Sequence, residues 1–432
     1  MIDAHIPVSE YISRRDKVLK GLGGAVGVVF AGEGGPPLSG RWLPHYHFYY
    51  LTGIRAEQGA AILFDPKHED PTRRCVLFLR PANPEMEQWD GRREPLGQHL
   101  RDTTGFTRIM RTGALDNFLT QAIRRTKRAA CLHPASLPSQ PVPPDLAKFR
   151  QIAERVVGVS IEDRTGLVPH LRSVKSRAEQ TLMKRALEIT KHGYEALIGV
   201  MEPGASERDL HNALVAAFRA GGSEGPAYNP IIGAGLNATV LHYMDNTAPI
   251  ADGDLICLDA GAEFGGYAAD ITRSLPANGT FSKRQREIYE IVLRAQEASI
   301  RACKPGASMH EVDKAGRDII EKAGFGDAYI HGVGHHLGLE VHDVTPDGKL
   351  EPGQIVTIEP GIYLPDEQIG VRIEDDILIT PGGRTNLSRD IPKHPDEVEA
   401  WIRAVRKGGK SPVPARNAPK KPAKKTAPRA RK

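Results

Sequence analysis

The chain has 432 residues, of which 40% are hydrophobic and 26% charged, a globular balance with enough length for two separate cores. No run of eighteen apolar residues and no apolar leader occur, which argues against a membrane span and a secretory signal. The four cysteines form no CxxC pair, which argues against a zinc ribbon and a disulfide framework. These observations predict a reduced, cytoplasmic protein. The formal net charge is +5, but residues 406–432 carry eleven basic and no acidic residues, so the rest of the chain is mildly acidic at −6.

Residues 1–165 are predicted to form an α/β domain, because short β-branched runs alternate with amphipathic segments. The expected strands are Val26–Phe30, Ala60–Phe64 and Cys75–Leu79. The expected helices are Ser9–Leu22, Leu115–Lys127 and Leu146–Val157. Proline-rich stretches such as 137–144 separate these elements.

Residues 166–405 are predicted to form a second domain built on an internal repeat. Residues 201–210 (MEPGASERDL) resemble residues 303–312 (CKPGASMHEV), and each copy contains a Pro-Gly break followed by a serine capping box. Ser176 and Glu179 form a further capping box that opens a helix towards Ile198. Each helix pair precedes glycine-punctuated strands, so we expect two similar α/β halves related by a pseudo-twofold axis, with a cleft between them.

Two acids in the first half are predicted to share a β-hairpin. In residues 254–275 (DLICLDAGAEFGGYAADITRSL), Asp259 and Asp270 are symmetric about Phe264–Gly265. In an antiparallel hairpin the two residues would then be directly opposite, with Cβ atoms about 5 Å apart. Like charges so placed repel each other, and a bound divalent cation would relieve the repulsion.

The second half repeats this arrangement. In residues 355–379 (IVTIEPGIYLPDEQIGVRIEDDILI), Glu359 and Glu374 are symmetric about a turn at Asp366–Glu367. Either acid pair alone could be an exposed polar rung of a ladder. Two such pairs within apolar strands favour a metal site.

Histidines and glycines alternate between the two hairpins, in residues 331–343 (HGVGHHLGLEVHD). Glycine allows the backbone to approach a bound group closely. A phosphate-binding loop is the rival interpretation, but no Gly-Lys-Ser/Thr follows. Four carboxylates and one histidine favour Mn²⁺ first, then Fe²⁺ or Co²⁺, and Zn²⁺ last. Five ligands are too many for one ion with an open position, so we expect two bridged ions about 3.5–4 Å apart.

These motifs resemble the pita-bread metallopeptidases, the family of methionine aminopeptidase, prolidase and aminopeptidase P. LDAG, ADITRS, HGVGHHLGLEVHD, TIEPGIY and GVRIEDD match the family in order and spacing. Residues 48–53 (FYYLTG) and the segment from Arg80 to Gly91 resemble the N-terminal domain of aminopeptidase P. The resemblance implies an N-terminal creatinase-type α/β domain followed by a pita-bread catalytic domain.

The resemblance also implies roles for nine side chains. The implied metal ligands are Asp259, Asp270, His335, Glu359 and Glu374. Glu359 would also act as the general base, and Arg372 would pair with the metal-site carboxylates. His242 would contact the substrate near the scissile bond, while His331 and His342 would shape the proline site and stabilise the tetrahedral intermediate. Val-Thr-Pro-Asp-Gly after Asp343 departs from the family and bears on substrate preference rather than on the chemistry.

The expected activity is hydrolysis of an N-terminal Xaa-Pro bond by a hydroxide that bridges two metal ions. The expected partners are a peptide with proline at its second position and further copies of the chain in a dimer or tetramer. A prolidase, which cleaves only dipeptides, is the nearest alternative; methionine aminopeptidase is disfavoured by the extra N-terminal domain. A protein of different class, a non-catalytic fold that binds through its tail, is disfavoured by the intact ligand set.

Residues 406–432, rich in Lys, Arg, Pro and Ala, are predicted to be a disordered tail. Weak contact with polyanions and simple solvation are both compatible with this composition. The tail has no aromatic residue to stack on bases, which favours solvation.

Overall fold

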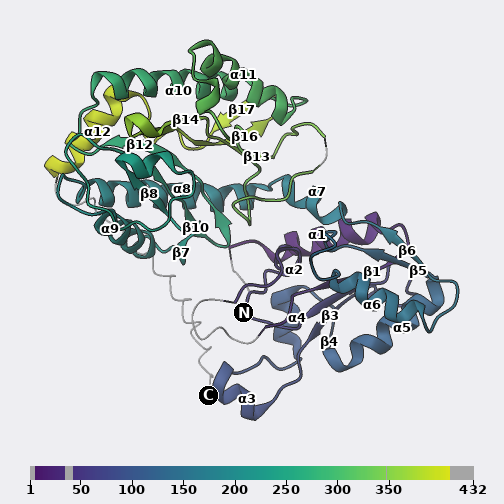
Figure 1. Ribbon diagram of the computed structural model, residues 1–432. Helices are drawn as coiled ribbons and strands as arrows, with labels where there is room; N and C mark the ends of the chain where they lie inside the picture. Colours follow the sequence, from purple (N-terminus) through teal and green to yellow (C-terminus); the bar gives the residue numbers. More distant parts are fainter. Residues whose placement is uncertain (1–4, 35–41, 347, 409–432) are drawn as a thin grey trace, which may run out of the picture.

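The computed structural model describes residues 5–34, 42–346 and 348–408. It has two lobes joined through helix α7, Leu167–Ser173 (Figure 1). Among the described residues no helix is long and apolar enough to cross a membrane. All four cysteines are free, as the sequence predicted.

The N-terminal lobe is built on a six-stranded mixed sheet in the order β4-β3-β2-β1-β5-β6. Its strands are β1 (Val26–Phe30), β2 (Ala61–Phe64), β3 (Cys75–Leu79), β4 (Arg108–Arg111), β5 (Arg128–Cys131) and β6 (Ser160–Asp163). Its helices are α1 (Val8–Gly21), α2 (Tyr46–Thr52), α3 (Pro84–Asp90), α4 (Gln98–Thr104), α5 (Leu115–Thr126) and α6 (Pro144–Ala153), with 3-10 turns at Pro71–Arg73 and Thr112–Ala114. The three strands and three helices expected here are confirmed to within a few residues.

The C-terminal lobe repeats one plan twice, a helix pair followed by antiparallel strands. The first half contains α8 (Arg177–Ile198), α9 (Glu207–Ala220), β7 (Gly225–Pro226), β8 (Ile231–Ala234), a 3-10 turn (Gly235–Thr239), β9 (Leu255–Asp259), β10 (Ala262–Phe264), β11 (Tyr267–Ala268) and β12 (Thr272–Pro276). The second contains α10 (Lys283–Ala302), α11 (Met309–Lys322), a 3-10 turn (Gly326–Ala328), β13 (Ile355–Ile358), β14 (Gly361–Leu364), a 3-10 turn (Pro365–Glu367), β15 (Ile369–Arg372), β16 (Asp375–Thr380) and β17 (Gly383–Asn386). This order confirms the expected fold class.

Local sequence signals explain where the long helices begin. The side chains of Ser176, Ser206 and Ser308 each accept a hydrogen bond from the backbone N–H three residues on, and the acid at that position accepts one from the serine backbone N–H. All three predicted capping boxes are therefore confirmed. The helices α8 and α9 pack on each other, as do α10 and α11, and cover the strands of their own half. The last helix, α12 (Pro395–Gly408), continues past residue 406, where the tail was expected to begin. The remainder of the tail lies outside the described residues, and the domain limits at 165 and 405 stay predictions.

The two lobes share a buried core. Val18 and Phe48 of the N-terminal lobe belong to the same apolar cluster as Met183 and Leu337 of the C-terminal lobe. The Tyr49 hydroxyl also donates a hydrogen bond to the Gly265 carbonyl across this boundary, at 3.1 Å. The N-terminal lobe is therefore packed directly against the hairpin of β10 and β11 in the C-terminal lobe.

Three histidines of the N-terminal lobe are held neutral. His45, His47 and His133 lie in edge contact, with the His45 ring 4.8 Å from His47 and 4.5 Å from His133. Burial lowers the pKa of His45 to about 3 and of His133 to about 4, and it holds the pKa of His47 well below its usual range.

We predict that acid destabilises the N-terminal lobe through these histidines. Below about pH 6.5 the unfolded chain binds protons that the folded chain refuses, so the free energy of unfolding falls as the pH falls. The double variant His45→Asn with His133→Gln keeps an acceptor near the backbone N–H groups of His47 and Phe30 but removes two titrations. In urea unfolding, the slope of the free energy of unfolding against pH should be shallower in this variant, by an amount that corresponds to up to about two fewer protons taken up on unfolding. Identical pH profiles would contradict the prediction.

Candidate metal centre

Asp259 ends β9 and Asp270 stands two residues before β12, and the register of this strand pair corrects the sequence prediction. Asp259 is paired with Thr272, not with Asp270, so the prediction that the two acids are directly opposite is wrong by two residues. The reason is the turn, which is centred on Gly265–Gly266 with φ angles of 60° and 80°. A two-residue hairpin turn of this kind needs positive φ at both central positions, which two glycines satisfy and Phe264 does not.

A shift of two residues leaves both acids on the same face, because side chains alternate along a strand. Asp259 and Asp270 are buried, and the Tyr228 hydroxyl lies within hydrogen-bond distance of both carboxylates. They therefore remain neighbours although the register differs.

The second acid pair has the predicted register. Ile358 pairs with Asp375 on one side, and Gly361 pairs with Arg372 on the other, around the turn at Pro365–Glu367. The same register places Glu359 opposite Glu374. The predicted symmetry of these two acids is confirmed.

Glycine and threonine fix His335 between the acid pairs. A Cβ on Gly334 would lie 2.1 Å from the Thr357 carbonyl oxygen, so only glycine allows the chain to pass here. Thr357 then holds the His335 backbone from both sides, through its own N–H at 2.8 Å and its hydroxyl at 3.1 Å. The His335 Nε2 atom lies 3.5 Å from Asp270 and 3.6 Å from Glu359.

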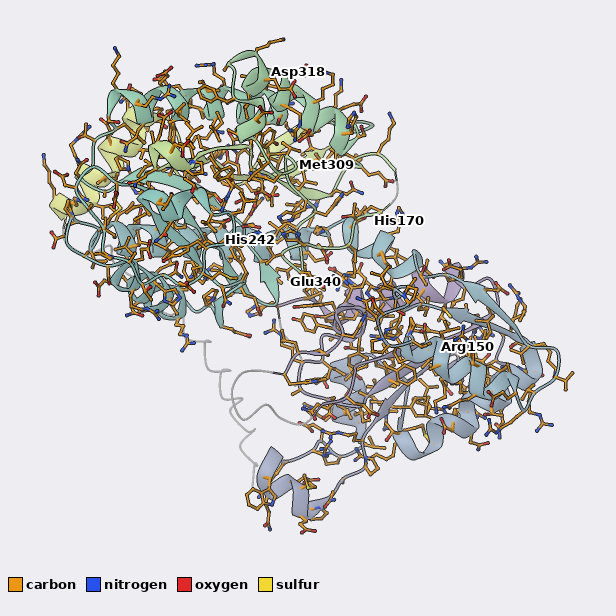
Figure 2. All side chains as sticks on the ribbon, in the orientation of Figure 1. Arg150, His170, His242, Met309, Asp318 and Glu340 are labelled. Atoms are coloured by element: carbon orange, nitrogen blue, oxygen red, sulfur yellow. The ribbon has the colours of Figure 1, made fainter. Side chains whose placement is uncertain are left out.

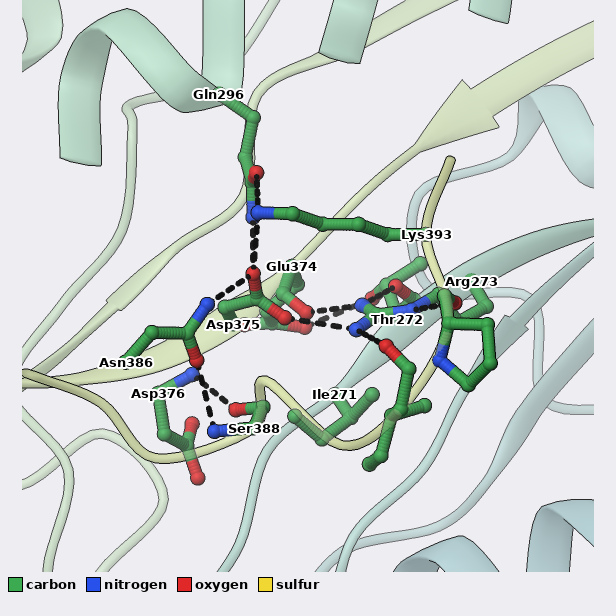
Figure 3. A network of polar contacts seen from close by, with 12 residues as sticks. Ile271, Thr272, Arg273, Gln296, Glu374, Asp375, Asp376, Asn386, Ser388 and Lys393 are labelled. Atoms are coloured by element: carbon green, nitrogen blue, oxygen red, sulfur yellow. Dashed lines mark hydrogen bonds and ion pairs between the residues drawn. The ribbon is translucent and has the colours of Figure 1, made fainter. Parts of the chain in front are cut away.

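The two halves are tied together beside the acids. The Thr272 hydroxyl donates to the Glu374 carboxylate at 2.8 Å, and the Glu374 N–H donates to the Thr272 carbonyl at 3.1 Å. Arg273, fully buried, donates to the Glu374 carbonyl and to the Asp375 carboxylate (Figure 3). The backbone just after Asp270 is thereby fixed to the backbone at Glu374.

All nine side chains predicted from the sequence line one cavity of about 580 Å³. These nine side chains are Asp259, Asp270, His242, His331, His335, His342, Glu359, Arg372 and Glu374. Figure 2 labels His242 in the C-terminal lobe. The His335 and His342 rings are stacked with centroids 3.9 Å apart. Asp270, His335 and Glu374 offer ligand atoms that all lie within 4.8 Å of one another, a spacing that one ion could bridge.

Burial disfavours the charged form of three acids in this cavity. It raises the pKa of Glu359 to about 7 and, with neighbouring carboxylates, raises the pKa of Asp270 and of Glu374. Burial also opposes charge on His335, but the Asp270 and Glu359 carboxylates outweigh it and raise its pKa to about 9. Four clustered carboxylates thus make the cavity favourable for a bound positive charge. Divalent cations fit this donor set.

Two tyrosines take part in the contacts of this cavity, and neither was foreseen from the sequence. The Arg372 guanidinium donates to Asp259 at 2.7 Å, and it also contacts the Tyr363 hydroxyl at 2.9 Å. Tyr363 in turn lies 2.9 Å from His331 Nε2. Arg372 was expected beside the acids, but Tyr228 and Tyr363 were missed. Tyr228 lies in no motif that resembles the family, and Tyr363 ends the TIEPGIY motif, for which the resemblance implied a role only at Glu359.

Known proteins share both lobes. Residues 181–381 match metallopeptidase family M24, and residues 11–131 match the N-terminal domain of aminopeptidase P. The Xaa-Pro aminopeptidase of Haemophilus influenzae is 33% identical over 390 residues, covering 82% of this chain and 86% of that protein. The Xaa-Pro aminopeptidase of Escherichia coli is 34% identical over 397 residues, covering 83% and 89%. The structure of Pseudomonas aeruginosa aminopeptidase PepP aligns with a TM-score of 0.82 at 32% identity, covering 93% of this chain and 99% of that one.

We predict that Mn²⁺ stabilises the wild type and that Asp270→Asn abolishes the effect. A cation that binds only the folded state adds about 2.7 kcal/mol at a hundredfold excess over Kd. Without metal, Asp270→Asn should be no less stable than the wild type, because it removes one of the mutually repelling buried charges. Thermal unfolding with and without Mn²⁺ measures both effects. Asp327→Asn, an exposed change outside the cavity, is the control and should respond like the wild type. An undiminished metal response in Asp270→Asn would refute the site.

Proposed function

This chain belongs to metallopeptidase family M24 and is a metallo-aminopeptidase, and we propose that it hydrolyses the bond between the first residue of a peptide and a proline at the second position. The observation that supports this most is the single cavity in which two acid pairs from different halves of the repeat meet four histidines. Both matched relatives are named for Xaa-Pro cleavage.

Two divalent ions, Mn²⁺ by preference, are the proposed cofactors. The ligands are Asp259, Asp270, His335, Glu359 and Glu374, an oxygen-rich set suited to hard cations. When bound, the two ions would supply Lewis-acid activation of the peptide carbonyl and of the attacking water, with hydroxide as the proposed nucleophile.

Glu359 is the proposed general base. Its carboxylate lies at the cavity wall, where burial raises its pKa to about 7, the range in which a carboxylate exchanges protons efficiently near neutral pH. Cation binding will lower this value, as charge pairing does for any carboxylate. Arg372 keeps Asp259 in place through a 2.7 Å hydrogen bond.

The three histidines outside the ligand set have positions that suit substrate binding. His342 and His242 would donate hydrogen bonds to the developing oxyanion. Burial lowers the pKa of His331 to about 4, so its ring is neutral at physiological pH. The neutral ring, fixed by Tyr363, would form one wall of the proline site with His342.

The proposed setting is the cytoplasm, supported by four free cysteines, and the proposed assembly is a homo-oligomer. Substrate binding requires the free amine of the first residue to enter the cavity beside the carboxylates. This contact would restrict cleavage to the first peptide bond.

We predict that the wild type with Mn²⁺ releases the first residue of an Xaa-Pro-Xaa tripeptide. Glu359→Gln should lower kcat by about 10²- to 10⁴-fold, because the proton acceptor is lost. Asp366→Asn, exposed in the turn of the same hairpin, is the matched control and should retain activity. Release of the first residue is measured by chromatography. An inactive wild type, or full activity in Glu359→Gln, would overturn the assignment.

A substrate-length series separates an aminopeptidase from a dipeptidase. We expect a peptide of five or more residues to be cleaved at least as well as an Xaa-Pro dipeptide, and an Xaa-Ala peptide to be cleaved poorly. The ratio of kcat/KM values is the measurement. Cleavage of the dipeptide alone would identify a prolidase.

A further inference from the structure

A buried ion cluster lies where the two lobes meet, outside the metal cavity. Asp343 accepts hydrogen bonds from Arg172 at 2.5 Å and from Lys175 at 3.0 Å. The three side chains are 1%, 2% and 1% exposed, respectively. Arg172 ends α7, and Lys175 stands just before α8, so both cations come from the connection between the lobes.

Asp343 directly follows His342 and closes a loop that starts at His336. The Asp343 N–H donates to the His336 carbonyl at 2.9 Å, which fixes both ends of residues 336–343 to each other. At the start of this loop, His335 is stacked on His342 across 3.9 Å. The position of the His342 ring over His335 therefore depends on how the loop is closed.

The sequence of the loop leaves room for the carboxylate. A Cβ on Gly338 would lie 2.1 Å from Asp343 Oδ2 and 2.8 Å from the Lys175 Cε atom. Gly338 has no positive φ, so the close approach of this ion pair, rather than backbone conformation, requires glycine there. The Gly338 carbonyl also accepts a hydrogen bond from Ala268 of β11, at 2.9 Å.

The other side of the cluster belongs to the N-terminal lobe. Arg172 lies 3.0 Å from His47 Nδ1 and 5.7 Å from the centre of the Tyr46 ring, both in α2. Its remaining acidic partner is Glu340, at 2.7 Å, whose side chain is 37% exposed; Figure 2 labels Glu340 where the lobes meet. Arg172 thus joins α2 to residues 336–343, the loop that carries His342 and is called the catalytic loop below.

The chemistry of the cluster favours a positioning role. Burying charges is expensive, and a buried ion pair is often no more stabilising than apolar residues of the same volume. It fixes geometry well, however, because each hydrogen bond to a charged group is short and directional. Two cations that converge on one carboxylate hold that carboxylate in one place.

We propose that Asp343, held by Arg172 and Lys175, is a positioning residue that sets the place of His342 in the substrate cavity. The inference rests on the proposed function, in which His342 contacts the reacting carbonyl. It assigns the lobe junction a second task, because the residues that join the lobes also fix the catalytic loop.

The test compares Asp343→Asn with Glu340→Gln. Both changes remove a carboxylate that Arg172 contacts, but only the first releases the loop. Gly338→Ala is a second, charge-preserving variant, since its methyl group displaces the Asp343 carboxylate, and it serves if Asp343→Asn does not fold. A misplacement of about 1 Å at a catalytic group lowers rates by up to about 10²-fold.

We expect Asp343→Asn and Gly338→Ala to lower kcat at least about tenfold with KM changed less than about threefold, and Glu340→Gln to change kcat less than about threefold. In a His342→Ala background, Asp343→Asn should add less than about threefold, because its effect passes through His342. A full additional loss there, or wild-type kcat in both loop variants, would overturn the proposal.

Amide hydrogen exchange of the metal-free protein provides a readout without catalysis. We expect exchange at residues 336–343 to rise at least about tenfold in Asp343→Asn, with the exchange of α8 and α10 unchanged. Unchanged loop exchange, or a rise spread over the whole lobe, would refute the positioning role. If the wild type cleaves no Xaa-Pro peptide, the proposed function fails, and this experiment still decides whether Asp343 holds the loop.

Discussion

Mutual repulsion among buried carboxylates is the constraint around which the catalytic lobe is built. Asp259, Asp270, Glu359 and Glu374 line one cavity, although burial and neighbouring carboxylates raise the pKa of Asp270, Glu359 and Glu374 and so disfavour their charged forms. Asp259 ends β9, and the other three acids stand in the short breaks between β11 and β12, between β13 and β14 and between β15 and β16. The ladder hydrogen bonds on either side of these breaks do not depend on a cation, so they keep the acids in place without one.

A second set of buried charges lies just behind the cavity, and in this set the carboxylate is paired with protein cations. Asp375 accepts from Arg273, Lys393, Gln296 and Asn386 (Figure 3). Burial opposes its charge, but Arg273 and Lys393 outweigh burial and lower the pKa of Asp375 to about 2. Glu374, the preceding residue, has a raised pKa. Adjacent acids on one chain thus have opposite environments, one satisfied by protein cations and one left for a metal.

The lobe junction follows the same logic on a smaller scale. Arg172 and Lys175 neutralise Asp343, which burial alone would disfavour as an anion, and their charges lower its pKa below the usual range. The N-terminal lobe packs on β11 and on the loop after His335 through the shared apolar core. It is therefore part of the environment of the catalytic loop as well as a neighbour of it.

The sequence by itself determined strands β1 to β3, the capping boxes and the register of the Glu359–Glu374 hairpin, because these depend on patterns within some twenty residues. It placed the Asp259–Asp270 hairpin two residues out of register, since composition alone did not decide which two of Phe264, Gly265 and Gly266 form the turn. Only the tertiary structure brought Tyr228 and Tyr363 to the site and paired Arg172 with Asp343 at the lobe junction. Those contacts join residues from 9 to 171 positions apart, and no local periodicity encodes such separations.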